Sequence, residues 1–391
     1  MHILILPSWY KTLDEPVKGT FFEEQARSLM EQSHKVGIIC FNFLSFSSKE
    51  ESVNEQHIDN HLITKFLTFR ALLPYNRKFN YWLLCVRANK VFKQYCNING
   101  KPQIIHAHSV FYGGIIANYL SKKNNIPYVV TEHLTNFITN KLNNTYDIQI
   151  SKKIFTKSKQ TIVVSSDFKE KLSEKLNLPR SVFMVISNTV STLFYETFCV
   201  NPLSLKEPII FFTSSFITER KNHMLIINAF AHVLKGYPTC MLYIGGYAAT
   251  SENTVYLDSL KQLCINLNIQ NQVLFLGKLS REETKKYMDK CHAFLLASFY
   301  ETFGVVLIEA LACGRPVIST NSGGPLDIVT PSNGIIVSSF EVKDFKNAMC
   351  SLIENYTFYH PTQIRENCIS AYGSNAIAYQ LQNCYQQFIY I

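Results

Sequence analysis

The sequence lacks the long apolar runs of a membrane-spanning protein. Its 391 residues are 47% hydrophobic, but no stretch approaches the roughly 18 to 20 uninterrupted apolar residues that a transmembrane helix needs. The first residues, MHILILPSWY, have no basic region and no small-residue cleavage site, so they are interpreted as a first strand and not as a signal peptide. Both features predict a cytoplasmic protein.

Cysteine pairs with metal-binding or redox spacing are also missing. The eleven cysteines are scattered from Cys40 to Cys384, and no Cys-x-x-Cys occurs. No cluster of His, Cys and carboxylates has the spacing of a metal site, and no two aspartates form Asp-x-Asp. We therefore expect reduced, mostly buried thiols, no metal and no cofactor.

Three common catalytic motifs are absent from the sequence. It contains no Gly-x-x-x-x-Gly-Lys-Ser/Thr phosphate loop, no Gly-x-Gly-x-x-Gly fingerprint and no Gly-x-Ser-x-Gly elbow. These absences argue against an NTPase, a dinucleotide-dependent dehydrogenase and an α/β-hydrolase.

Acidic residues are missing between Asp59 and Glu132, although ten lysines and arginines fall there and contribute to the net charge of +9. Aromatic residues are interleaved with them over residues 62–101, a mixture typical of proteins that lie on an anionic bilayer. One alternative is a solvated basic helix whose aromatic residues face the core. A nucleic-acid partner is a third option, but no DNA- or RNA-binding motif accompanies the charge; we expect an anionic membrane surface and no nucleic acid.

Strand-like and helix-like patterns alternate along the chain. Short apolar runs such as HILILP, VGIICFNF, IIHAH, PYVVTE and QTIVV predict buried parallel strands. Helical periodicity covers 20–33, 78–96, 112–123 and 167–176, and, in a second series of strands and helices, 221–235, 254–267 and 304–313. Thr20 with Glu23, and Ser280 with Glu283, have the spacing of capping boxes. The alternation predicts an α/β chain with two Rossmann-like domains.

The periodicity lapses over residues 195–208, where two prolines occur, and we expect the linker there. The predicted domains are therefore residues 1–200 and residues 201–373. The last helical pattern, 374–391, is expected to pack back onto the first domain.

The stretch ETFGVVLIE follows a predicted strand and begins a predicted helix. In an open parallel sheet, ligands bind beyond the carboxyl ends of the strands, close to helix N-termini. The amides of Phe303, Gly304 and Val305 therefore suit an anion such as a phosphate, with Glu301 beside them. Glu309 falls in the second turn of the helix, where burial is costly unless the carboxylate accepts strong hydrogen bonds. Two readings stay open for Glu309: a ribose diol, or an ion pair with a neighbouring Lys or Arg.

Two other segments share that sheet edge. The loop NSGGPLDIV places Gly323 and Gly324 after the next strand, where their amides suit a second anionic or hydroxyl group; taken alone, a Gly-Gly pair is usually a turn. Arg220 and Lys221 follow the first strand of the second domain, and such fixed cations stabilise the charge that develops on a departing diphosphate. A surface Arg-Lys pair at a helix start is the alternative.

The first domain offers two candidates at the ends of its own strands. Gly19 precedes a helix that begins after the first strand, a position suited to an anion. His133 ends the strand PYVVTE, although a lone histidine is more often structural than catalytic, and His106 and His108 are ambiguous in the same way.

These residues resemble a known family. ETFGVVLIE is similar to the Glu-x7-Glu signature of the retaining glycosyltransferases of family 4, which have the GT-B fold of two facing Rossmann-like domains with a cleft between them. Further matches occur in family order over nearly the whole chain: LPSWY, GTFFEEQARSL, IIHAHS, IPYVVTEH, RKNHMLIINAF, VLFLGKLS, EALACGRPVIST, SGGPLDIV and NGIIV.

The resemblance implies roles in donor binding and catalysis. Glu309 would bind the ribose of a nucleotide sugar, Glu301 the hydroxyls of the transferred sugar, and Lys221 the leaving diphosphate. The amides from Phe303 to Val305 would hold sugar and phosphate.

The same resemblance implies that Gly19 lies near the phosphates, Leu279 lies against the base and His133 lies near the anomeric centre. The chain departs from the family pattern where "GRL" is replaced by Ser215-Phe216-Ile217, which leaves Arg220 as the candidate for the second cation. It also has SNTVS at 187–191 for "PNGVD", and Asp327 ends the SGGxxE motif.

The implied function is a metal-independent, retaining transfer of a sugar from a nucleoside diphosphate sugar to a lipid-linked glycan in cell-surface polysaccharide biosynthesis. The enzyme would be cytoplasmic and peripheral on the inner face of the cytoplasmic membrane. Two alternatives stay open: a nucleotide-sugar-binding protein that has lost catalysis, and another GT-B enzyme such as a phosphorylase or an epimerase. A phosphorylase would need a pyridoxal-phosphate lysine site, which we do not find.

Overall fold

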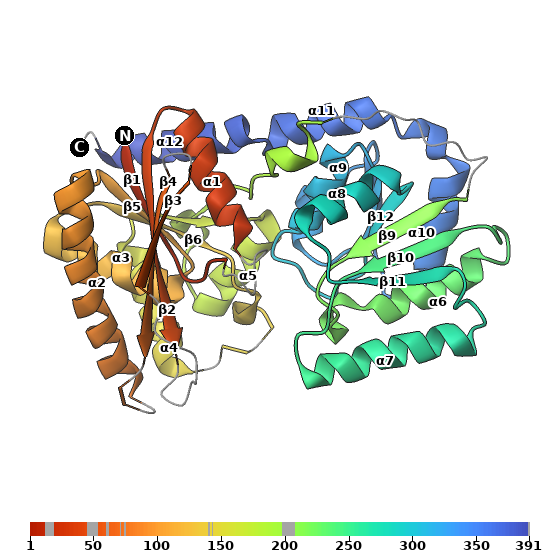
Figure 1. Cartoon of the computed structure of the whole chain (residues 1–391), viewed down its shortest axis with the longest axis horizontal. Helices are drawn as coiled ribbons and strands as arrows, with labels where there is room; N and C mark the ends of the chain where they lie inside the picture. The colour runs from red at the N-terminus through yellow and green to blue at the C-terminus, as the bar shows by residue number, and fades with distance from the viewer. Residues whose placement is uncertain are drawn as a thin grey trace. The chain divides into compact units, whose positions relative to one another are not determined.

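The chain divides into two compact units, each built on one sheet (Figure 1). The computed structural model describes residues 1–11, 19–44, 54–59, 62–70, 72–73, 76–139, 141–142, 144–197 and 208–389. Unit 1 comprises Met1–Thr189 with Ser374–Ile391, and unit 2 comprises Val190–Gly373.

The division at Thr189 precedes the boundary that the sequence predicted at 200/201. Residues after it are bonded to unit 2: the amide of Val190 donates to the carbonyl of Tyr372 (2.8 Å), and the Cys313 thiol donates to the carbonyl of Phe194 (3.5 Å). Most of the expected linker, residues 198–207, lies outside the described residues.

The sheet of unit 1 has eight strands, of which seven are parallel and β3 pairs antiparallel with β4 at one edge. Their order is β3-β4-β2-β1-β5-β6-β7-β8. The strands are β1 (His2–Pro7), β2 (Lys35–Leu44), β3 (Asn54–Asp59), β4 (Leu62–Arg70), β5 (Ile104–His108), β6 (Tyr128–Glu132), β7 (Gln160–Val163) and β8 (Phe183–Val185). Because β4 lies between β2 and β3, part of the basic stretch 62–101 belongs to the sheet.

Helices cover both faces of this sheet. They are α1 (Thr20–Glu31), α2 (Arg77–Asn99), α3 (Ile115–Asn124), α4 (Thr145–Lys157), α5 (Ser166–Leu176) and α12 (Ser374–Ile389). Helices α1 and α12 pack on one face, where Phe22 and Leu381 share a core with Ile3 and Ile5 of β1. Alternate residues of a strand point to opposite faces, so Ile3 and Ile5 belong together. The C-terminal helix therefore packs on unit 1.

The start of α1 differs from the prediction. Gly19, with φ of 70°, is the N-cap of α1, so Thr20, which the predicted capping box placed at the cap, is the first residue of the helix. The Glu23 carboxylate instead accepts from Arg27 (2.6 Å) and Lys11 (2.5 Å). A carboxylate that has two cations within reach gains more from them than from one backbone amide.

Unit 2 has a six-stranded, wholly parallel sheet in the order β11-β10-β9-β12-β13-β14. Its strands are β9 (Ile210–Ser214), β10 (Met241–Gly245), β11 (Val273–Gly277), β12 (Ala293–Leu296), β13 (Val317–Thr320) and β14 (Gly334–Val337). Its helices are α6 (His223–Val233), α7 (Ser251–Asn266), α8 (Arg281–Lys290), α9 (Val305–Ala312), α10 (Val342–Glu354) and α11 (Pro361–Tyr372). The predicted capping box of Ser280 and Glu283 is confirmed at the start of α8.

No helix within the described part of the chain combines the length and apolar character needed to cross a bilayer. Over the same residues, no three His, Cys, Asp or Glu side chains are grouped so that they could hold a metal ion. The ten cysteines that the structure describes form no disulfide bond.

Candidate active site

The strand order of unit 2 reverses between β9 and β12, because β10 and β11 lie on one side of this pair and β13 and β14 on the other. Beyond the carboxyl ends of two such strands, helix N-termini diverge and leave a crevice for ligands. The segments that emerge there carry the predicted residues. Arg220 and Lys221 lie in the short helix after β9, and Glu301 lies in the loop after β12.

Glu301 is the centre of a buried polar cluster. Its Oε1 accepts hydrogen bonds from Lys221 Nζ (2.6 Å) and Ser298 Oγ (2.6 Å), and Arg220 Nη1 lies 3.4 Å away. The Glu301 and Lys221 side chains are only 11% and 12% exposed. Burial by itself raises the pKa of Glu301, but the charges of Lys221 and Arg220 and these hydrogen bonds outweigh it and lower the pKa. The carboxylate is therefore ionised and fixed.

Arg220 is held by the same loop. Its Nη1 donates to the carbonyl of Tyr300 (2.7 Å), and the amide of Phe299 donates to the carbonyl of Arg220 (2.9 Å). The Arg220 side chain remains 37% exposed, so it combines a fixed position with access to solvent. This geometry suits a cation that meets an anionic ligand.

The loop after β12 is joined to the loop after β13. Glu301 forms a parallel β-bridge with Gly323, the Glu301 amide donates to the carbonyl of Ser322 (2.7 Å), and the Gly324 amide donates to the carbonyl of Glu301 (2.9 Å). A Cβ on Gly324 would lie 2.4 to 2.6 Å from backbone atoms of Phe303. The Gly324 amide thus donates its hydrogen bond inside the protein, and a contact between Gly324 and the sugar donor stays a prediction. Glycine is required here for the close approach of two loops.

The N-terminus of α9 has the geometry expected for an anion. Gly304 is its N-cap, with φ of 107°, a conformation that favours glycine. Among the described residues, nothing accepts a hydrogen bond from the amides of Val305 and Val306. Phe303 has a buried side chain that packs edge-on against Tyr372, so Phe303 anchors the turn and only its backbone is available to a ligand.

Glu309 lies in the second turn of α9 and is 7% exposed. Its Oε1 is 3.5 Å from Nη2 of Arg281, whose guanidinium lies over the ring of Phe194. The ion pair is the alternative to ribose binding that the sequence left open. Leu279 follows β11 in the chain and packs beside the last residue of β10, since a Cβ on Gly245 would be 2.6 Å from Leu279 Cδ1.

In unit 1, three histidines form a stack at the ends of β5 and β6. His133 Nε2 is 3.1 Å from His108 Nδ1, and the ring of His106 is 4.2 Å from that of His108. Burial lowers the pKa of His133 and of His106 to about 3 each. All three imidazoles are therefore neutral at physiological pH.

The tautomer of His133 follows from an unpaired atom. Within the described residues, the buried Nε2 of His108 has no hydrogen-bond partner. A buried unpaired N–H is rarer than an unpaired acceptor, so the geometry favours His108 carrying its proton on Nδ1 and donating to His133 Nε2. His133 then carries its own proton on Nδ1.

Glu132, which was not among the predicted site residues, holds this turn. It is fully buried and accepts hydrogen bonds from the amides of Val110 (2.8 Å), His133 (2.8 Å) and Leu134 (2.9 Å). Burial raises its pKa, and the hydrogen bonds oppose that shift only in part. An acid directly before the predicted His133 was a signal that could have identified it.

A cavity of about 350 Å³ opens beside this turn at the carboxyl ends of β1 and β6. Its walls are Ser8, Trp9, Arg77, Asn80, Tyr81, Phe111, Tyr112, Leu134, Leu142 and Asp147. Gly19 lies next to it, because a Cβ on Gly19 would be 3.3 Å from the Trp9 ring. Unit 1 therefore has a mixed polar and aromatic cavity next to His133 and Gly19.

The predicted residues of unit 2 thus gather at one sheet edge, and those of unit 1 gather at another. Ser298 and Arg281 were not predicted from the sequence, although they are the partners of Glu301 and Glu309. Ser298 precedes Glu301 by three residues, and Arg281 begins a helix whose cap was predicted. Neither spacing reveals the contact, which depends on how loops from different strands meet.

The chain matches two protein-family models that together cover most of its length. The model described as Glycosyltransferase Family 4 matches residues 19–193, and Glycosyl transferases group 1 matches residues 196–371. The chain is 25% identical over 320 residues to the uncharacterized glycosyltransferase MJ1178 of Methanocaldococcus jannaschii, covering 81% of each protein.

The chain is 24% identical over 212 residues to the alpha-1,3/1,6-mannosyltransferase ALG2 of Dictyostelium discoideum. The matched region covers 49% of this chain and only 50% of that relative. Among solved structures, Alr3699/HepE of Anabaena in complex with UDP superimposes with a TM-score of 0.75 at 18% identity, covering 99% of this chain and 100% of that one. The chain therefore belongs to glycosyltransferase family 4, the retaining glycosyltransferases with the GT-B fold.

Proposed function

We propose that this glycosyltransferase moves a hexose from a nucleoside diphosphate sugar, without a metal ion, to a lipid-linked glycan in the synthesis of cell-surface polysaccharide. One observation carries the proposal. At the point where the strand order of unit 2 reverses, the buried Glu301 carboxylate and the cations Lys221 and Arg220 lie in one cluster. That cluster combines a hydrogen-bond acceptor for sugar hydroxyls with positive charge for a diphosphate.

In the proposed reaction the diphosphate gains negative charge as the bond to the anomeric carbon breaks. Lys221 and Arg220 stabilise that charge, and Arg220 supplies the second cation that the family pattern places in the segment now occupied by Ser215-Phe216-Ile217. The amides of Val305 and Val306 add N–H donors at the start of α9. Because the positions of these groups are set before the reaction, they cost no reorganisation in the transition state.

Glu301 binds hydroxyls of the transferred sugar in this scheme. Its carboxylate is ionised at neutral pH and fixed by Ser298, so it orients the sugar. We infer that the acceptor hydroxyl attacks from the same face as the leaving group and that a diphosphate oxygen takes its proton. No side chain therefore serves as the nucleophile.

For the nucleoside we keep the roles that the resemblance implies. Glu309 binds the ribose, with Arg281 as the ion-pair partner of its buried carboxylate, and Leu279 contacts the base. Gly323 lines the donor site through the loop that is bonded to Glu301. In unit 1, Gly19 lies near the phosphates and neutral His133 lies near the anomeric carbon.

The acceptor is proposed to bind in unit 1, and the cavity beside His133 supports this. Aromatic walls and polar groups in one cavity are typical of a site that takes a carbohydrate. We propose that the enzyme works at the inner face of the cytoplasmic membrane, with the basic and aromatic residues within 62–101 facing anionic lipid.

The test is a screen of the purified protein against UDP-, GDP-, ADP- and dTDP-linked sugars, with EDTA present. We expect one nucleotide family to raise the melting temperature and to release its diphosphate slowly without metal. Lys221→Met should lower the rate about 10²- to 10³-fold, which is typical for the loss of one group that stabilises transition-state charge. Glu301→Gln should abolish turnover.

The matched control is Glu354→Gln, which removes a carboxylate at the surface end of α10 that pairs only with the Tyr237 hydroxyl among the described residues. It should react as the parent does. Failure of every nucleotide sugar to stabilise a folded protein would contradict donor binding. Stabilisation by one of them with no turnover would mean a binding protein that has lost catalysis.

A further inference from the structure

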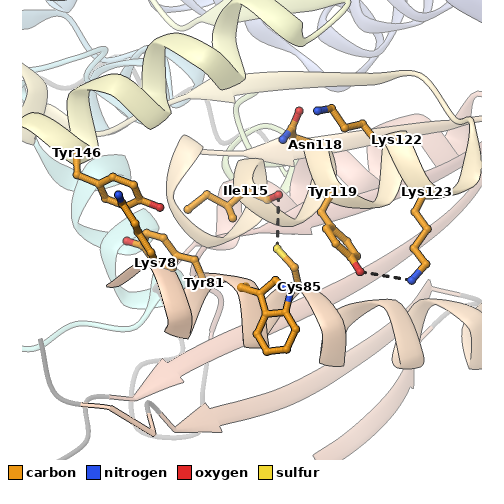
Figure 2. Close-up of a pocket in the computed structure, with 10 residues that line it drawn as sticks. Lys78, Tyr81, Cys85, Ile115, Asn118, Tyr119, Lys122, Lys123 and Tyr146 are labelled. Atoms are coloured by element: carbon orange, nitrogen blue, oxygen red, sulfur yellow. Dashed lines mark hydrogen bonds between the residues drawn. The ribbon is translucent and has the colours of Figure 1, made fainter. Parts of the chain in front are cut away.

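A groove of about 450 Å³ lies in unit 1 between helices α2, α3 and α4. Figure 2 shows its lining: Lys78 and Tyr81 come from α2, Tyr119, Lys122 and Lys123 from α3, and Tyr146 from α4. A contact from the Cys85 thiol to the Ile115 carbonyl joins α2 to α3 within it. The groove is separate from the second cavity, beside His133, although Tyr81 lines both.

The groove has a positive rim without acidic partners. Lys78, Lys122 and Lys123 are exposed, and Lys153 and Lys157 of α4 are exposed nearby. Among the residues that the structure describes, no carboxylate lies within ion-pair distance of these five lysines.

These lysines also crowd one another. The charge of Lys122 lowers the pKa of Lys157, and Lys153 contributes to the shift. Charges that repel each other in this way destabilise the folded chain slightly. An anionic partner on the groove would convert that repulsion into attraction.

Aromatic rings alternate with the cations. Lys78 Nζ lies 5.5 Å from the ring centroid of Tyr146, and Lys123 Nζ lies 5.6 Å from that of Tyr119. Trp82 lines the same groove and is 57% exposed. Lysine, tyrosine and an exposed tryptophan together are typical of proteins at the boundary between lipid headgroups and water, because the rings are apolar and their edges are polar.

We propose that this groove binds the phosphate headgroups of anionic bilayer lipids, with Trp82 entering the headgroup layer. The inference deepens the membrane contact in the proposed function, on which it rests for its biological use, but the binding itself requires no turnover. The proposal also changes which residues contact the membrane. Lys122, Lys123, Tyr119 and Tyr146 lie outside the stretch 62–101, and only the fold brings them to α2.

The test is co-sedimentation of the whole chain, without a nucleotide sugar, with vesicles of phosphatidylcholine alone or mixed with phosphatidylglycerol. We expect binding only to the mixed vesicles, weakening as salt screens the charges. Each lysine near an anionic surface contributes about fivefold in affinity, so Lys122→Gln/Lys123→Gln should weaken binding roughly thirtyfold. The variant should fold, since both side chains are exposed.

The control is Lys235→Gln/Lys343→Gln, which removes the same charge from exposed positions of unit 2. Equal weakening by both double variants would overturn the proposal, because binding would then depend on net charge alone. So would equal binding to pure phosphatidylcholine. A single-stranded RNA that competes with the vesicles at equal salt would assign the groove to nucleic acid instead.

A second measurement tests whether the groove itself contacts the bilayer. The chain has only two tryptophans, so Trp82→Phe isolates the contribution of Trp82 to the fluorescence. Brominated phosphatidylglycerol should quench the parent more strongly than it quenches this variant. Equal fractional quenching would mean that Trp82 does not reach lipid and would overturn the proposal even if the vesicles bind.

Discussion

The pair of Glu301 and Lys221 gives the sharpest test of the site, because its energy can be estimated from burial. Both side chains are about nine-tenths buried, and the charged atoms are 2.6 Å apart. Removing one member of such a pair leaves the other charge buried without compensation, which costs about 3 to 5 kcal/mol. Glu301→Gln would leave Lys221 and Arg220 facing each other, so we expect a loss of at least ~3 kcal/mol.

The reciprocal change should cost less. In Lys221→Met the Glu301 carboxylate keeps Ser298 as a donor and Arg220 as a cation. The double variant removes both charges, and its loss should be smaller than the sum of the two single losses, by roughly 2 kcal/mol, since residues in one network are not additive. The pair Lys285–Asp289 has the same 2.6 Å distance, and its lysine is 11% exposed, but its acid is 30% exposed. Because Lys285→Met leaves that acid in reach of water, this change should cost less, about 1 kcal/mol.

Thermal unfolding, followed by tryptophan fluorescence and by circular dichroism, measures these losses of stability. Both tryptophans lie in unit 1, so their fluorescence reports on that unit, whereas circular dichroism reports on both units. A loss of ~3 kcal/mol in a unit of this size lowers its melting temperature by roughly 6 to 12 °C. We expect that shift in the dichroism transition of Glu301→Gln. A shift no larger than that of Lys285→Met would refute the estimate and the buried ion pair behind it.

The same pair predicts a dependence on pH. The folded-state pKa of Glu301 is lowered from its ordinary 4.5. Its contribution to stability is therefore fully present above pH 4.5 and is lost as the pH falls through the folded-state value. Glu301→Gln should lose this part of the acid sensitivity, and an unchanged acid profile of the dichroism transition would contradict the assignment.

Three further outcomes are expected. Glu309→Gln should weaken nucleotide binding by about 10- to 100-fold, the value of a hydrogen bond to a charged group, with a smaller effect on kcat; a change confined to kcat would exclude ribose binding. Gly324→Ala should lower the melting temperature of unit 2, because overpacking costs about 1 to 3 kcal/mol, whereas Gly236→Ala, with 3.9 Å to its nearest neighbour, should not. The pKa of His106 is about 3 in the folded chain, against its ordinary value of 6.5. Because only the unfolded chain takes up this proton between those two values, the stability of unit 1 should fall by up to about 1.4 kcal/mol for each pH unit below 6.5. An imidazolium signal for His106 by NMR at pH 6 would contradict this.

Much of the fold could be predicted because it depends on local pattern. The helix expected at 78–96 extends over Arg77–Asn99, and that expected at 304–313 extends over Val305–Ala312. Strand β4 was missed because its residues mix apolar and basic side chains, which were assigned to a surface. Its place between β2 and β3 depends on pairing partners that are distant in sequence.

The residues of the candidate site divide in the same way, into those that motif spacing could select and those whose role depends on the fold. Motif spacing was enough to select Glu301, Glu309, Lys221 and Gly304, since strand ends and helix starts can be located from the sequence. The sequence assigned the glycine pair to a ligand, whereas the structure uses Gly324 to let two loops touch. Close approach of two backbones leaves no signal in the spacing of one loop.

The sequence by itself determined the alternation of strands and helices, the family and the acids and cations of the site, because each depends on residues close together in the chain. Only the tertiary structure decided which groups meet: Ser298 with Glu301, Arg281 with Glu309, and the lysines of α3 with the aromatic residues of α2 and α4. Those contacts depend on strand order and helix packing, which arise from burial of the whole core.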